Sequence, residues 1–123
     1  MQSLMNISVS ALGAFGEGMH TIANNLANMN TPGFKAQRAD YETGPNGQGV
    51  GVGIIQTDYS DGPLIADIPP QRPGDMPGVR EGSNVSIERE FVNMISTEHA
   101  YSANAAVIRS YEDSSGVILN LIA

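Results

Sequence analysis

Residues 22–34 read IANNLANMNTPGF and mark the place where a long segment of helical pattern stops. Four of the seven residues before Thr31 are asparagine, which costs roughly 0.5–0.7 kcal/mol relative to alanine inside a helix. Thr31 precedes a proline and is therefore biased away from helical backbone, and Pro32-Gly33 suits a type II turn. We therefore predict a long helix that ends near Asn30.

Upstream of this stop, apolar side chains recur at seven-residue intervals. Apolar positions at alternating steps of three and four residues make the a/d seam of a coiled coil, which Ser8 interrupts here. Three glycines weaken such a helix by about 1 kcal/mol each, and they leave room for close helix approach. The expected seam residues are Met5, Leu12, Phe15, Met19, Ile22 and Leu26.

A second stripe with the same period lies near the C-terminal end of the chain. Ser86 suits an N-cap, and Glu88 and Glu90 place negative charge in the first turn, where the helix dipole favours it. Residues 114–116, Ser-Ser-Gly, are expected to weaken the helix. The apolar residues after them carry no charge and should need a partner. The seam residues of this helix are Ile87, Phe91, Met94, Tyr101 and Ile108.

Glycine and proline divide the chain into three regions. All seven prolines and ten of the fourteen glycines lie within residues 31–83. There the stretch GVGVGIIQTDYSDG (49–62) predicts a strand ending in a turn, and Leu64–Ile68 a second strand of the same small hairpin. The stretch RPGDMPG (72–78) is expected to be irregular linker.

The expected fold is one mainly α domain. An N-terminal helix (1–30) and a C-terminal helix (84–123) form an antiparallel, coiled-coil-like pair. A Gly/Pro-rich connector (31–83) with a short β hairpin joins them.

The composition excludes several classes of function. Charged residues make up 15% of the 123 residues, against about 25% in a typical domain, so much of the surface is expected to be buried against neighbours. The net charge is −7 without any run of Lys or Arg, which argues against nucleic-acid binding. There is no cysteine for a disulfide or a thiol nucleophile. We expect neither a cleaved secretory signal nor insertion into a membrane, because no positively charged leader and no apolar run of ~20 residues occurs.

The candidate metal ligands are sparse. Glu17 and His20 share a helical face at a spacing used in di-metal bundles, but the second helix offers only the adjacent Glu98 and His99, which point in different directions. We therefore expect no enzyme activity, no metal and no cofactor.

Two long blocks of the sequence are similar to a known family. SALGAFGEGMHTIANNLANMNTPGFKAQR (10–38) resembles the N-terminal signature of the bacterial flagellar rod and hook proteins. NVSIEREFVNMISTEHAYSANAAVIRSYED (84–113) resembles their C-terminal signature. The order of the blocks and the short insert between them are most similar to a small proximal-rod protein.

This resemblance implies a structural subunit of the basal-body rod, which crosses the periplasm. It implies assembly by helix packing into a hollow axial tube that transmits torque. Its expected partners are other rod and hook-family subunits, further copies of itself, and the flagellar export apparatus, which would export it without a cleaved signal peptide.

The asparagines have a corresponding interpretation. Their amides both donate and accept hydrogen bonds, so they can fix the register between packed subunits. The residues expected to do so are Asn24, Asn25, Asn28, Asn30 and Asn104. Alternatives are that these side chains face water near a helix end, that the two helices only pair with each other, or that the chain is a secreted helical module that binds a single partner.

Overall fold

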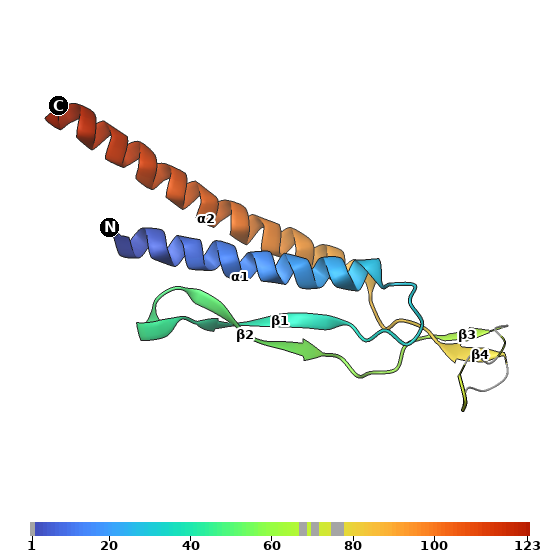
Figure 1. Cartoon of the computed structure of the whole chain (residues 1–123). Helices are drawn as coiled ribbons and strands as arrows, with labels where there is room; N and C mark the ends of the chain where they lie inside the picture. The colour runs from blue at the N-terminus through green and yellow to red at the C-terminus, as the bar shows by residue number, and fades with distance from the viewer. Residues whose placement is uncertain (1, 67–68, 70–71, 75–77) are drawn as a thin grey trace.

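Figure 1 shows the computed structural model of the chain, which describes residues 2–66, 69, 72–74 and 78–123. Two long helices lie side by side in opposite directions, and a β hairpin runs along the other side of the first helix. The first helix is therefore the middle layer of three. The elements in chain order are α1 (Gln2–Ala27), β1 (Gln37–Thr43), η1 (Pro45–Gly47), β2 (Val50–Thr57), β3 (Leu64–Ala66), β4 (Val79–Glu81) and α2 (Ile87–Ile122).

The helix α1 ends at Ala27, slightly before the predicted end at Asn30. Beyond it the N–H of Thr31 donates to the carbonyl of Asn28 at 3.0 Å. A second turn follows, in which the N–H of Phe34 donates to the carbonyl of Thr31 at 3.2 Å and Gly33 has a φ of +73°, which favours glycine. The turn expected at Pro32-Gly33 is therefore present, and Asn28 and Asn30 belong to the turn that precedes it rather than to the helix.

The helix α2 runs without a break through residues 114–116 to Ile122. Its N-cap is Ser86, as predicted, and the hydroxyl of this residue accepts from the N–H of Arg89 at 3.5 Å. One glycine costs about 1 kcal/mol in a helix, which does not interrupt one of 36 residues. Because α1 has only 26 residues, the end of α2 extends beyond α1 (Figure 1).

The predicted strand pairing is wrong. The strand β2 pairs antiparallel with β1, not with the segment that starts at Leu64, and β3 pairs instead with β4 in a second hairpin. The reason is the turn between β1 and β2, where Asn46 and Gly47 both have positive φ (61° and 72°). This pair of positive φ angles reverses the chain inside the loop 44–49, where the Gln48 N–H donates to the Pro45 carbonyl at 3.3 Å, so β2 returns alongside β1. Residues 67–68 of the predicted strand, and 75–77 of the predicted linker, lie outside the described residues.

The core lies on the faces of α1 that α2 and the hairpin cover, and most of its side chains are small or polar. The buried positions Ala11, Gly18 and Asn25 follow the seven-residue period, but they precede the predicted seam positions Leu12, Met19 and Leu26 by one residue. One residue corresponds to a rotation of about 100° around the helix. Because α1 is covered on two sides, small residues let both neighbours approach closely. This explains why the buried positions precede the predicted seam positions by one residue. The other buried residues of α1 are Ser8, Ala14, Thr21 and Ile22.

Within the described part of the chain, neither helix combines the length and apolar character needed to cross a bilayer.

Candidate assembly surfaces

Tyr41 ties the three layers together. Its side chain leaves β1, passes α1 at Gly18 and forms a hydrogen bond with Thr97 of α2. Its ring also packs edge-on against Phe15, with ring centroids 5.3 Å apart. Burial raises the pKa of Tyr41, and the hydrogen bond with Thr97 opposes that rise. A Cβ atom on Gly18 would overlap the Tyr41 Oη and lie 3.2 Å from its Cζ, so this crossing requires glycine.

Asn25 docks the hairpin onto α1. It is 0% exposed, and its amide makes two bonds to the backbone of Gln37 at the start of β1. The Oδ1 atom accepts from the Gln37 N–H at 2.9 Å, and Nδ2 donates to the Gln37 carbonyl at 2.6 Å. An amide side chain supplies this donor and acceptor pair as a neighbouring strand would. Asn25 thus has an intrachain role that the sequence interpretation did not foresee.

The other candidate asparagines also contact their own chain or face solvent. Asn28 donates to the Asn24 carbonyl at 2.9 Å, and Asn104 donates to the Ala100 carbonyl at 2.9 Å. The side chains of Asn24 and Asn30 are exposed. Hydrogen bonds between subunits stay a prediction, for which the exposed amides are the accessible donors and acceptors.

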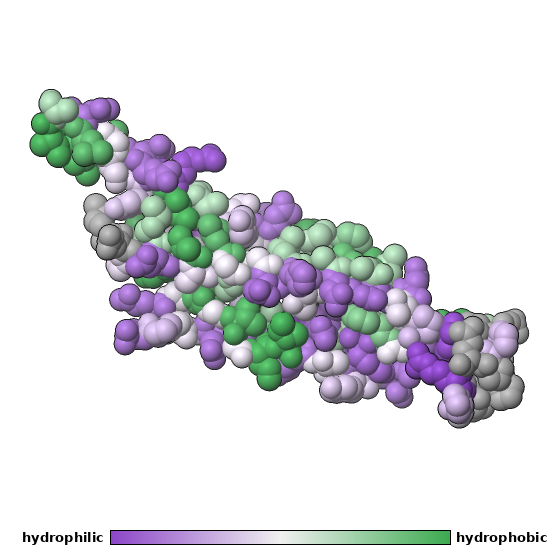
Figure 2. Space-filling view, in the orientation of Figure 1, coloured by the Kyte–Doolittle hydropathy of each residue, from purple (hydrophilic) through white to green (hydrophobic). Residues whose placement is uncertain are grey.

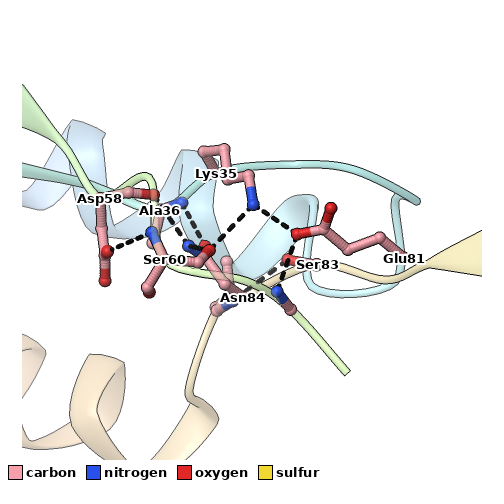
Figure 3. Close-up of polar contacts among 9 residues, drawn as sticks. Lys35, Ala36, Asp58, Ser60, Glu81, Ser83 and Asn84 are labelled. Carbon is pink, nitrogen blue, oxygen red and sulfur yellow. Dashed lines mark hydrogen bonds and ion pairs between the residues drawn. The ribbon is translucent and has the colours of Figure 1, made fainter. Parts of the chain in front are cut away.

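Three chain segments meet in a cluster that we call the polar junction (Figure 3). Asn84 lies at its centre: Oδ1 accepts from the Ala36 N–H at 2.6 Å, and Nδ2 donates to the carbonyls of Asp58 and Ser60 at 2.8 and 2.9 Å. One side chain thereby joins the segment after α1, the end of the first hairpin and the entry to α2. The junction consists of Lys35, Ala36, Asp58, Ser60, Glu81 and Asn84.

Charge reinforces the polar junction. Lys35 donates to the Ser60 carbonyl at 2.8 Å and forms an ion pair with Glu81, which also accepts from the Gly62 N–H at 2.8 Å. Lys35 first, and then the Gly62 N–H, hold the pKa of Glu81 below its ordinary value. The Ser60 N–H likewise lowers the pKa of Asp58.

Sequence reasoning missed this junction, although Lys35 and Asn84 lie in the two sequence blocks that carry the resemblance. The available signal was that one of the two residues lies in each block. This signal did not reveal that the two side chains belong to one cluster.

The predicted seam residues are incompletely covered by the chain itself. Of the set, only Ile22 is buried. Ile87, Phe91 and Tyr101 of α2 are exposed. The remaining members are half-buried: Met5, Leu12, Phe15, Met19, Leu26, Met94 and Ile108.

The end of α2 is the most exposed apolar surface. Leu121 and Ile122 are 81% and 74% exposed, and residues 117–119 are exposed as well. Figure 2 shows this tip as an apolar cluster that stands clear of the rest of the molecule. Helices that are apolar on all sides are ordinarily buried, so this tip is suited to contact with another protein.

The candidate metal ligands do not meet. Glu17, His20, Glu98 and His99 are all exposed. Among the residues with described positions, no three His, Cys, Asp or Glu side chains are grouped so that they could hold a metal ion.

Comparisons with known proteins identify the family of the chain. Residues 5–35 match the family described as flagella basal body rod protein, and residues 76–121 match the flagellar basal body rod FlgEFG protein C-terminal family. The chain is 31% identical to a flagellar basal-body rod protein FlgC of Borreliella burgdorferi, with 88% of each chain covered. The two matched regions cover most of α1 and α2. The chain belongs to the flagellar basal-body rod proteins.

Proposed function

We propose that this structural subunit of the flagellar basal-body rod assembles through its two helices with further copies and with related rod and hook subunits. The assembly is a hollow axial tube that transmits torque across the cell envelope. The relative named as a rod protein supports the place of the chain in the rod. The uncovered apolar surface of the helices supports the mode of assembly.

The single observation that carries this proposal is the bare end of α2. Its apolar side chains at residues 117–119, 121 and 122 are all exposed. Full burial of one such side chain gains about 1.5–3 kcal/mol, so burial of all five gains on the order of 10 kcal/mol before the cost of association. A subunit in a multi-copy assembly can bury this surface and offset that cost.

The half-buried seam residues supply the lateral contacts in this proposal. Leu12, Met19 and Leu26 flank the inner face of α1, one position away from the buried series. They are placed to pack in coiled-coil fashion against the helices of neighbouring subunits, while the exposed Asn24 and Asn30 fix the register.

Transmission of torque requires elements that do not slip within one subunit. Tyr41 joins the hairpin to both helices, and the polar junction joins the end of the hairpin to the start of α2. These contacts support a subunit that moves as one body. The role is mechanical and needs no catalytic group or cofactor, and export proceeds through the flagellar export apparatus without a cleaved leader.

The test compares two equivalent substitutions in cells that carry the chain as their only copy. Leu121→Asp adds a charge to the bare tip of α2, whereas Leu64→Asp adds one at an equally exposed leucine in the hairpin β3–β4, away from the helices. We expect Leu121→Asp to abolish rod assembly and swimming, with secretion of the chain intact, and Leu64→Asp to preserve both.

Normal swimming of the Leu121→Asp strain would contradict assembly through the helices. The stoichiometry of binding distinguishes a rod subunit from the alternative, a module that binds a single partner. Such a module would saturate at one fixed small ratio, whereas a rod subunit is recovered in several copies from each isolated basal body.

A further inference from the structure

An apolar groove lies where the start of α1 meets the last third of α2. It is a cavity of about 440 Å³, and Leu4 of α1 forms one of its walls. Leu4 and Val107 are 43% and 38% exposed, so the contacts within the chain leave the groove open. The lining residues contributed by α2 are Ala106, Val107, Ser110, Tyr111 and Ser114.

The groove continues into the bare tip of α2 as one stripe of side chains. Val107, Tyr111 and Ser114 line the groove. Ile118 and Leu121 continue the series into the exposed tip at the same alternating steps of four and three residues. These steps keep side chains on one face of a helix, as in the a/d seam of a coiled coil. The occupant that matches the stripe is therefore another helix with the same spacing.

The charged side chains at this end of α2 lie away from the stripe. Between Val107 and the end of the chain they are Arg109, Glu112 and Asp113. At 3.6 residues per turn they point roughly 120–160° away from the middle of the stripe. A helix that packs on the stripe therefore does not have to bury a charged side chain, which would be costly.

The stripe has the same order of side-chain sizes in both directions. The small Ser114 lies at its centre, with the larger Tyr111 and Ile118 on either side of it. Val107 and Leu121 each lie seven residues from the centre, in opposite directions. A two-fold contact needs a surface that is complementary to itself, and two copies of this stripe in antiparallel orientation meet that condition. The antiparallel orientation also keeps the negative C-terminal ends of the two helices apart.

We propose that two free copies of this chain pair antiparallel through the stripe, so that the tip of each α2 enters the groove of the other copy. Leu121 of one copy then lies beside Leu4 and Val107 of the other, and the two Ser114 side chains meet at the two-fold axis. Because a two-fold contact closes on itself, the pair does not grow into a filament. It covers the tip that we assign to rod contacts, so it is a storage form that must separate before assembly.

Self-association of the purified chain tests the contact. We expect sedimentation equilibrium to show monomers and dimers without larger species, with a dissociation constant on the order of 10 µM, as for a small interface. Ser114→Glu opposes two carboxylates at the two-fold axis and should raise this constant by at least about tenfold. Ser102→Glu is the matched control, because Ser102 is also exposed on α2 but points roughly 140° away from the stripe. It should leave the constant unchanged, and both variants should keep the wild-type circular dichroism.

The orientation is tested by cysteine cross-linking of the purified chain, which has no cysteine of its own. Val107→Cys and Leu121→Cys lie roughly 21 Å apart within one helix, whereas a disulfide needs Cα atoms within about 7 Å. Every disulfide of the double variant is therefore intermolecular. We expect oxidation to join the double variant into dimers only, which reducing agent separates, and to leave each single variant monomeric.

The inference is wrong if the chain stays monomeric at millimolar concentration, if it forms species larger than a dimer, or if Ser114→Glu pairs like the wild type. A disulfide in either single variant would indicate a parallel pair, and a ladder of the double variant a head-to-tail contact; each of these also overturns it. The proposed function is tested separately. A chain that does not pair in solution but is retained in basal bodies leaves that function standing, whereas a chain that pairs but is missing from basal bodies contradicts the function alone.

Discussion

The crossing of Tyr41 over α1 makes Gly18→Ala an informative substitution. Alanine is the better helix former, so the change is expected to stabilise α1 wherever the added methyl group has space. At position 18 it has none, because the new Cβ would occupy the place of the Tyr41 Oη and crowd Cζ at 3.2 Å. The phenol must then withdraw from Thr97 and shift against Phe15.

The magnitude follows from opposing contributions. Helix propensity favours alanine by about 1 kcal/mol. Loss of the hydrogen bond with Thr97 costs about 1 kcal/mol, and a weakened edge-on contact with Phe15 costs about 0.5–1.5 kcal/mol. Crowding in a packed site adds about 1 kcal/mol, at the low end of measured overpacking. The net expectation is a destabilisation of about 1.5–2.5 kcal/mol.

Gly13 and Gly16 provide matched controls on the same helix. A Cβ at either position meets nothing within 4 Å, so each change to alanine should stabilise the protein by about 1 kcal/mol. Urea unfolding of the monomer, followed by circular dichroism, measures all three variants. In a Tyr41→Ala background, Gly18→Ala should become stabilising like the controls. The reasoning is refuted if Gly18→Ala stabilises the chain that retains Tyr41 as much as Gly13→Ala does.

Two further substitutions test the polar contacts. Lys35 and the Gly62 N–H lower the pKa of Glu81 from its ordinary 4.5, so its stabilising contribution is complete above that pH and is lost as the pH falls through the folded-state pKa. Glu81→Gln should therefore flatten the fall in melting temperature between about pH 6 and pH 3, and an unchanged slope would contradict the ion pair. Asn25→Leu leaves the N–H and carbonyl of Gln37 without their side-chain partner and should cost about 2–4 kcal/mol in urea unfolding, whereas the exposed Asn30→Ala should change stability by less than about 0.5 kcal/mol.

The helices could be predicted because their signals are local. The seven-residue period, the proline after Thr31 and the N-cap at Ser86 each depend on neighbours within about two turns. The weakness expected at residues 114–116 does not interrupt the helix, since a single glycine is a small cost in a long helix. The period did not show which face of α1 is buried. Large apolar residues indicated the seam, but α1 lies between α2 and the hairpin, and the small residues one position earlier are the buried ones.

The hairpins depended on signals of a different kind. The strand β1 reads QRADYET, which has no apolar alternation, so its sequence gave no reason to expect a strand. The Asn46-Gly47 turn was the available indication. The polar junction depends on where three distant segments cross, and the place of Lys35 and Asn84 in the two sequence blocks did not indicate that crossing.

The cluster of asparagines near the end of α1 has a cause within the chain as well as a proposed one between chains. Asn25 offsets its poor helix propensity with two hydrogen bonds to β1, and Asn28 takes part in the turn that ends the helix through its bond with Thr31 at 3.0 Å. Neither side chain is then available to set the register between subunits. The two exposed amides near the helix end are those of Asn30 and Asn24, and the Oδ1 atom of Asn24 accepts from Asn28 Nδ2 at 3.3 Å. We therefore expect any register that amides impose on the rod to act near the end of α1, and we expect the apolar tip of α2 to contribute to binding through burial.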